Sequence, residues 1–170
     1  MSRVQGFMEF KLKQHSEELA TKYGVPAEEV FDIVSKFLKD TYGPAVKTAE
    51  SISRREQPVI LFIGRESCAI CQKSKPELDL FLQNHRDLEQ VLLDYSNPEG
   101  LLYHMISQGE TGLLPMIAMI HKGCIRMIFT GKCVHSEVYE HYYEDLSSQR
   151  SQSSAAKIYM LSEFIGPSEG

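Results

Sequence analysis

The sequence predicts an α/β domain in which helices flank a small mixed sheet, in the order βαβαββα, behind an N-terminal helical extension. Residues 59–63 form a short, continuously apolar run with β-branched side chains, which is typical of a strand buried on both faces. Segments of strand and helix character alternate after this run, as in α/β proteins. Lys122 and Gly123 then separate two apolar runs by a turn short enough for a hairpin.

The chain divides into three parts on these patterns. We expect a helical extension at residues 1–56, the α/β domain at 57–149 and a C-terminal tail at 150–170. Residues 147–154 are polar and indicate a linker, and residues 155–165 are expected to dock as a terminal helix or strand.

Helical signals dominate the extension. Pro26 stands at a helix start, and Gly43-Pro44 is expected to close that helix. Its apolar residues recur at helical spacing: Val30, Ile33, Val34, Phe37, Leu38 and Tyr42. Residues 4–23 also follow a helical stripe, although residues 8–13 alternate as a strand would. Residues 48–57 are polar and form a connecting helix or a linker.

The stripe Val30-Ile33-Phe37 has two interpretations. The first makes it the side of the helix that faces the core. The second makes it a surface for a partner or for self-association, because an added helical hairpin beside a small domain often serves recognition.

The α/β domain begins with the strand at 59–63, which leads through a turn at 64–67 into a helix that ends near residue 84 and contains Pro76. The later elements are a strand at 90–94, a helix with Leu101, Leu102, Met105 and Ile106, strands at 116–121 and 125–129, and a helix with Val138, Tyr142 and Leu146. Connections through helices normally join parallel strands, so both crossovers are expected to be parallel. The hairpin joins an antiparallel pair.

Charge and hydropathy exclude several classes of function. The net charge of −5 is spread along the chain without a basic run, which argues against nucleic acid or an anionic membrane surface as a partner. The longest apolar stretch, residues 113–120, is far too short to span a membrane. The N-terminus lacks the apolar segment of a secretory signal, and we expect a cytoplasmic protein. In that compartment four cysteines indicate chemistry, a metal or core packing rather than structural disulfides.

Cys68-Ala69-Ile70-Cys71 lies where the buried strand gives way to a helix. At the helix N-terminus, unpaired N–H groups and the helix dipole favour an anion, so the pKa of the Cys68 thiol is expected below the free value of about 8.5. Cys71 follows one helical turn later and can resolve a mixed disulfide formed on Cys68. We expect Cys68 to be the more exposed thiol, with the two α-carbons about 4.4–6.8 Å apart.

Two other interpretations of this pair stay open. Cys124 and Cys133, or nearby histidines, could complete a zinc site, although their spacing lacks the second close pair of a zinc ribbon. Alternatively, Cys68 and Cys71 are inert cysteines in the core.

From residue 57 to 148 the chain resembles the thioredoxin superfamily. The strand before Cys68-x-x-Cys71, Pro76 five residues later, Leu114-Pro115 before a strand, and the hairpin followed by Gly131 carry the resemblance. It implies that Pro115 is a cis-proline facing the cysteines and that Leu114 offers its backbone to an extended substrate chain. An ordinary proline at a strand entry is the alternative.

The chain departs from thioredoxin at three places. Ser67 stands where thioredoxin has a tryptophan, and Ala69-Ile70 stand where it has Gly-Pro. Phe62 aligns with the buried aspartate that assists the resolving cysteine, and a phenyl ring cannot accept a proton. These departures imply that the domain is specialised for one partner or is retained as a scaffold.

Cys133 is a candidate third redox cysteine, because by resemblance it lies near the rim of the site. Its alternative role is that of a small apolar side chain. Cys124 lies at the far end of the same strand, about 20 Å away if extended, which argues against a Cys124–Cys133 disulfide.

These observations predict a thiol–disulfide oxidoreductase that acts on protein substrates, with Cys68 attacking and Cys71 resolving. Its partners would be a protein substrate or a reductase, and no dissociable cofactor is required because the sulfurs carry the electrons. The alternative is a non-catalytic thioredoxin-like interaction module that binds a partner through residues 1–56.

Overall fold

The computed structural model describes residues 3–107, 113–149 and 159–160 and confirms the thioredoxin-like α/β fold. Its sheet has the strand order β2-β1-β3-β4-β5. The strands are β1 (Val59–Gly64), β2 (Glu89–Asp94), β3 (Met116–His121), β4 (Cys124–Thr130) and β5 (Tyr159–Met160). Among these described strands, β1 and β2 are parallel and the other neighbouring pairs are antiparallel.

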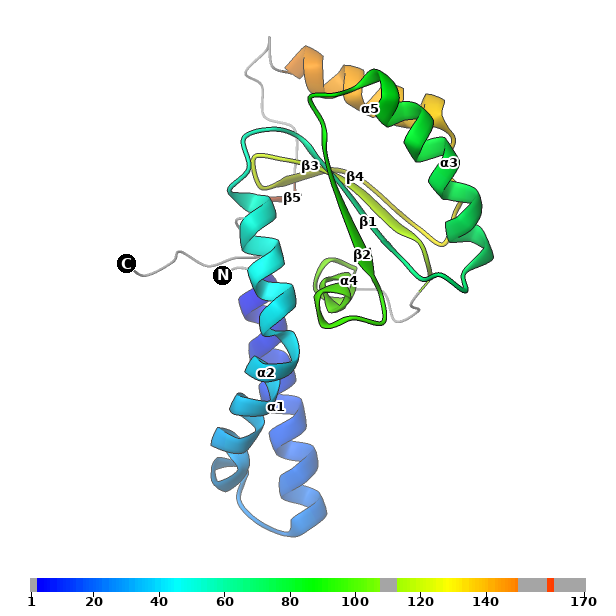
Figure 1. The fold of residues 1–170 in the computed structure, drawn as a ribbon. Helices are drawn as coiled ribbons and strands as arrows, with labels where there is room; N and C mark the ends of the chain where they lie inside the picture. The colour runs from blue at the N-terminus through cyan, green and yellow to red at the C-terminus, as the bar shows by residue number, and fades with distance from the viewer. Residues whose placement is uncertain (1–2, 108–112, 150–158, 161–170) are drawn as a thin grey trace.

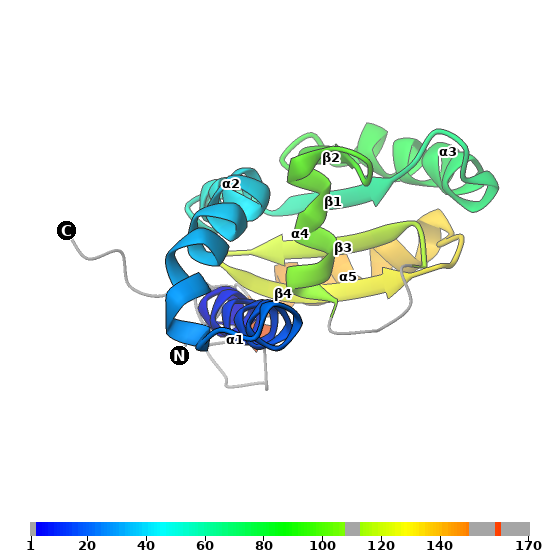
Figure 2. The ribbon, with the colours of Figure 1, turned by 90° about the horizontal axis from the view of Figure 1, so that it is seen from below.

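Helices cover both faces of the sheet (Figure 1 and Figure 2). They are α1 (Arg3–Tyr23), α2 (Ala27–Ser53), α3 (Ala69–Asn84), α4 (Leu102–Ile106) and α5 (Ser136–Gln149), with a 3-10 turn, η1 (Pro98–Leu101), before α4. Ile60 and Phe62 of β1 point to the face under α3 and α5. Leu61 and Ile63 point to the other face, under α1, α2 and α4. β1 is apolar throughout because both of its faces are buried.

The second crossover was predicted wrongly, because β3 runs antiparallel to β1. Ile63, near the end of β1, pairs with Leu93 at the end of β2 and with Met116 at the start of β3. The chain therefore enters β3 at the same end of the sheet at which it leaves β2. A connection that leaves and re-enters the sheet at the same end joins antiparallel strands, even when it contains a helix.

Helix α2 does not close at Gly43-Pro44 as predicted but continues to Ser53. A proline inside a helix removes one hydrogen bond and costs about 3 kcal/mol. Ala45, Ala49 and Ile52, in the last turns, are buried against the sheet, and this burial offsets the cost. Thr48 Oγ1 also donates a hydrogen bond to the Pro44 carbonyl oxygen at 3.0 Å.

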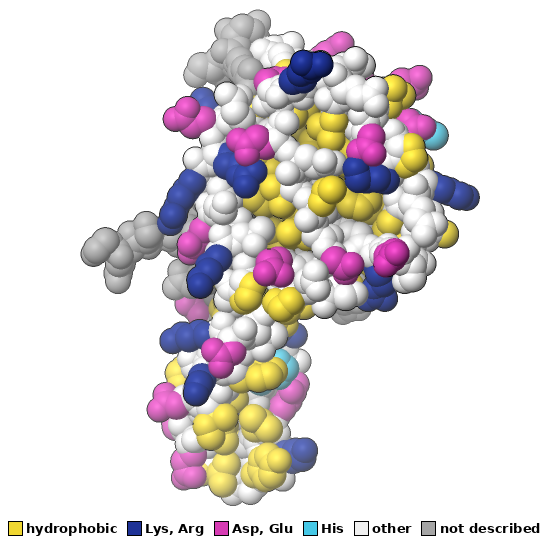
Figure 3. Space-filling view, in the orientation of Figure 1, with side chains coloured by type: hydrophobic (Ala, Val, Ile, Leu, Met, Phe, Trp, Pro, Cys, Tyr) yellow, Lys and Arg dark blue, Asp and Glu magenta, His cyan; other side chains and the backbone are white. Residues whose placement is uncertain are grey.

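The interpretation of Val30-Ile33-Phe37 as a core-facing stripe was wrong. Ile33 is 68% exposed and Phe37 59% exposed, whereas Val34 and Leu38 are buried between the helices. The apolar surface of α2 is wider than the strip that α1 covers, so one edge of it stays outside. Residues 3–42 are here called the helical arm: Val4 packs in the core under the sheet, whereas the free end of the arm extends away from the sheet and carries apolar side chains on its surface (Figure 3).

Candidate active site

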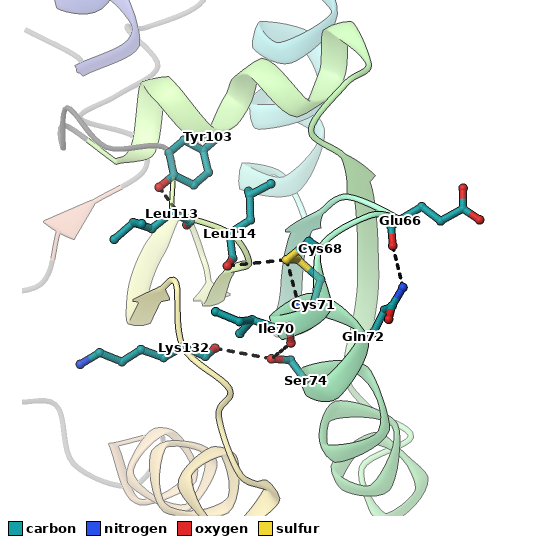
Figure 4. Close-up of a disulfide and its surroundings, with 10 residues drawn as sticks. All are labelled: Glu66, Cys68, Ile70, Cys71, Gln72, Ser74, Tyr103, Leu113, Leu114 and Lys132. Atoms are coloured by element: carbon teal, nitrogen blue, oxygen red, sulfur yellow. Dashed lines mark hydrogen bonds between the residues drawn. A yellow bond between two sulfur atoms is a disulfide. The ribbon is translucent and has the colours of Figure 1, made fainter.

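Cys68 and Cys71 form a disulfide at the start of α3, directly after β1 and its turn (Figure 4). Their α-carbons lie 5.2 Å apart, within the expected range. Cys68 has extended backbone angles and caps the helix, and its Sγ accepts a hydrogen bond from the Cys71 N–H at 3.1 Å. One of the N–H groups in the first turn of α3 that lack a partner within the helix thus points at the sulfur of Cys68.

The two sulfurs differ in exposure as expected. Cys68 is half-buried, and Cys71 is 5% exposed within the apolar cluster under α3 and α5. An external reagent therefore reaches Cys68 first.

Leu114 and Pro115 lie against the disulfide from the opposite side. The Leu114–Pro115 peptide bond is cis. Cys68 Sγ lies 3.8 Å from the Leu114 carbonyl oxygen, to which the reduced thiol can donate. Gly131, with a φ of 67°, donates its N–H to the Pro115 carbonyl oxygen at 2.9 Å and ties this loop to the end of β4.

Sequence reasoning missed Tyr103, which fixes the loop before the proline. Its side chain is fully buried, and its hydroxyl donates to the Leu113 carbonyl oxygen at 3.1 Å (Figure 4). Leu113 itself is 55% exposed, so the contact holds a surface residue to the core. A tyrosine among the apolar residues Leu102, Met105 and Ile106 could have indicated a buried hydroxyl with a partner.

Ser74 and Gln72 hold the start of α3 in place. Ser74 is buried one turn after Cys71, and its Oγ donates to the Ile70 carbonyl oxygen at 2.8 Å and to that of Lys132 at 3.5 Å. Gln72 Nε2 donates to the Glu66 carbonyl oxygen at 2.8 Å. These contacts fix the turn before Cys68 and the loop that precedes Cys133.

Phe62 and Gly64 lie next to the sulfur of Cys71. Phe62 is 7% exposed and packs with Cys71 in one cluster, so an apolar ring lies where a proton acceptor would be useful. A Cβ on residue 64 would lie 3.3 Å from Cys71 Sγ and 2.7 Å from Phe62 Cε1. Glycine at this position therefore leaves room for the sulfur and the ring.

Cys133 is a free, half-buried cysteine in the loop between β4 and α5. Cys124 is buried at the start of β4, and its thiol donates to the Lys122 carbonyl oxygen at 3.6 Å. Among the described residues, no three histidine, cysteine or acidic side chains are grouped as a metal site would require.

Glu77, on α3, forms a hydrogen bond with the start of α5. Its carboxylate accepts a hydrogen bond from the Ser136 N–H at 2.9 Å, at the first residue of α5. This hydrogen bond, with a smaller effect from His135, holds the pKa of Glu77 below its ordinary value. The carboxylate thereby joins α3 to α5 beside the loop that carries Cys133.

Comparison with known proteins finds similarity in solved structures alone, since no family model and no curated protein matches the sequence. Thioredoxin from Trypanosoma brucei brucei is 11% identical and has a TM-score of 0.47, over 61% of this chain and 86% of that one. Desulfothioredoxin from Desulfovibrio vulgaris Hildenborough is 17% identical with a TM-score of 0.47, over 59% and 88%. Thioredoxin-2 of the malaria parasite is 13% identical with a TM-score of 0.45, over 52% and 82%. This similarity is one of fold.

The described helices include none long and apolar enough to cross a membrane.

Proposed function

We propose that the protein is a thiol–disulfide oxidoreductase that acts on protein substrates through Cys68 and Cys71. The observation that supports it most is the reversible bond itself: a disulfide whose more exposed sulfur caps a helix and faces the backbone of Leu114. In this proposal an extended substrate chain lies beside Leu114 and Pro115.

The exchange proceeds in two balanced steps. The Cys68 thiolate attacks a substrate disulfide, forms a mixed disulfide and releases one substrate thiolate. The Cys71 thiolate then attacks the sulfur of Cys68, which releases the second substrate thiolate and leaves the Cys68–Cys71 disulfide. Two electrons pass to the substrate, and a reductase or another dithiol returns them to the pair. A cytoplasmic location, expected from the sequence, would keep the resting pair reduced.

Phe62 limits the second step in this proposal. Cys71 must lose its proton to attack, and Phe62 cannot take it. We therefore expect slow turnover on a generic substrate such as insulin.

The test is a trapping experiment with Cys71→Ser. This variant should accumulate mixed disulfides through Cys68, and Cys68→Ser with the same handling should accumulate none. Recovery of the trapped complexes from cells would identify the substrate. If Cys71→Ser traps nothing and the wild type reduces no insulin, the oxidoreductase proposal fails.

Cys133 is proposed as a third redox cysteine, supported by its half-buried thiol in the loop that Ser74 joins to α3. Redox titration of Cys133→Ser tests this role. If Cys133→Ser gives the same two-cysteine titration curve as the wild type, Cys133 has no redox role.

A second candidate function is that of an interaction module, in which the helical arm binds a partner or a second copy of the chain. The exposure of Ile33 and Phe37 favours it, because large apolar side chains grouped on a surface mark interaction sites. If Cys71→Ser traps nothing while the wild type still binds a partner through the arm, this function replaces the enzyme.

A further inference from the structure

A groove runs between α1 and α2 near the free end of the helical arm. It has a volume of about 540 Å³. Its walls come from residues of α1 (Glu9, Leu12, Lys13, Ser16 and Glu17) and from residues of α2 (Ala27, Glu28, Phe31 and Asp32). We call it the arm groove. It lies on the arm that extends away from the sheet, and no cysteine lines it (Figure 1).

The floor of the arm groove is apolar and incompletely covered. Leu12, Ala27 and Phe31 line it, and Phe31 is 47% exposed. Covering such a ring is favourable at about 25 cal/mol per Å² of apolar surface removed from water. The free protein thus leaves apolar surface exposed where two helices already form two sides of a channel.

Ser16 supplies a polar feature in the same wall. It is only 3% exposed, and its Oγ has no hydrogen-bond partner among the described residues. A buried hydroxyl without a partner costs about 1–3 kcal/mol.

The rim of the arm groove is acidic. Glu17, Glu28 and Asp32 place three carboxylates on it, against the ammonium group of Lys13. Lys13 Nζ lies 4.0 Å from Glu17 Oε1, and both side chains are well exposed. A surface of this kind attracts cationic groups and repels anionic ones.

We propose that the arm groove binds an amphipathic helix of a partner protein, whose apolar face is flanked by lysine or arginine. Helices pack 8–10 Å apart, so a third helix laid over two antiparallel ones covers the floor and completes a small bundle. Its apolar face contacts Leu12 and Phe31, and its basic flanks face the carboxylates of the rim. The proposal rests on the second candidate function, the interaction module, and is independent of the cysteine chemistry.

The other exposed face of α2 provides the control. Ile33 follows Phe31 by two positions, so the two side chains point to nearly opposite sides of the helix. The exposed charges beside Ile33 and Phe37 are mixed: Glu29, Lys36 and Asp40. That face therefore carries two carboxylates against one ammonium group, a weaker negative charge than that of the rim.

The experiment titrates the full chain with two synthetic peptides of about 14 residues, or roughly four helical turns. Both place leucine at helical spacing, one with lysine and the other with glutamate at the remaining positions. We expect the lysine peptide to bind and to shift the backbone NMR signals of residues 9–17 and 27–32. The glutamate peptide should bind at least about tenfold more weakly, and added salt should reduce this difference.

Paired variants locate the site. Glu28→Gln with Asp32→Asn removes two exposed charges of the rim and should weaken the lysine peptide by about three- to tenfold. Glu29→Gln with Asp40→Asn removes two charges outside the arm groove and should leave its affinity unchanged. Phe31→Ser should weaken binding by more than about tenfold, and the charge variants keep the test valid if this substitution unfolds the arm.

Three outcomes would overturn the proposal. Equal weakening by both charge pairs would show attraction to overall negative charge alone. NMR shifts centred on Ile33 and Phe37 would move the docking site to the other face and leave the interaction module standing. A dimer in sedimentation that Phe31→Ser dissociates would make a second copy of the chain the occupant.

Discussion

Gly64→Ala tests how tightly Phe62 and Cys71 pack around residue 64. The added methyl would lie 2.7 Å from Phe62 Cε1 and 3.3 Å from Cys71 Sγ. Phe62 and Cys71 are 7% and 5% exposed, so neither has open space to move into. Overpacking of this kind costs about 1–3 kcal/mol. The smaller entropy of the unfolded chain returns about 0.4–1 kcal/mol, and the midpoints of the two ranges leave a net loss of about 1.3 kcal/mol in the free energy of unfolding.

Gly43→Ala is the matched control, because a Cβ on Gly43 meets nothing within 4 Å. Gly43 lies inside α2, where alanine is favoured over glycine by about 0.5–1 kcal/mol. Urea unfolding of both variants, in the disulfide and dithiol forms, measures the effect. A loss confined to the disulfide form would show that reduction lets the Cys71 sulfur move away from the added methyl. If Gly64→Ala is as stable as the wild type in both the disulfide and the dithiol form, the packing around residue 64 is not tight.

Three further measurements address the rest of the site. Tyr103→Phe keeps the ring but removes the hydrogen bond to Leu113, so we expect the free energy of unfolding in urea to fall by about 1 kcal/mol. Insulin reduction should also be slower, and an unchanged rate would mean that this hydrogen bond has no role in the reaction. The folded-state pKa of Glu77 is lowered, so its stabilising contribution is complete above its ordinary value of 4.5 and is lost as pH falls through the folded value. The unfolding temperature of Glu77→Gln should therefore fall less between pH 7 and 3 than that of the wild type. An equal fall in both proteins would contradict this contribution of Glu77. Alkylation of the reduced protein should label Cys68 before Cys71, and the reverse order would exchange their proposed roles.

The sequence predicted the elements of the α/β domain well because their signals are local. The apolar run of β1, the helix start at Cys68 and the turn at Lys122-Gly123 each depend on a few consecutive residues. The cysteine pair and Pro115 were also identified in advance, since their types and order along the chain carry the resemblance. Their catalytic roles and the division at residue 56 stay predictions.

The errors arose where contacts between distant residues decide the outcome. The periodicity of α2 gives an apolar surface but does not say which strip of it α1 will cover, so Ile33 and Phe37 were assigned to the wrong side. Pro44 is a local stop signal, and the packing of Ile52 on the sheet overrides it.

The sequence by itself determined that a buried strand leads to a cysteine pair at a helix start, because strand, turn and helix preferences act over a few residues. Only the tertiary structure decided that β3 runs antiparallel to β1, that Tyr103 ties the proline loop to the core, and that Phe62 lies against Cys71. These features join residues far apart in the chain, and their energies depend on which surfaces meet. The arm groove belongs to the same class, because its apolar floor and acidic rim come together only when α1 and α2 pack side by side.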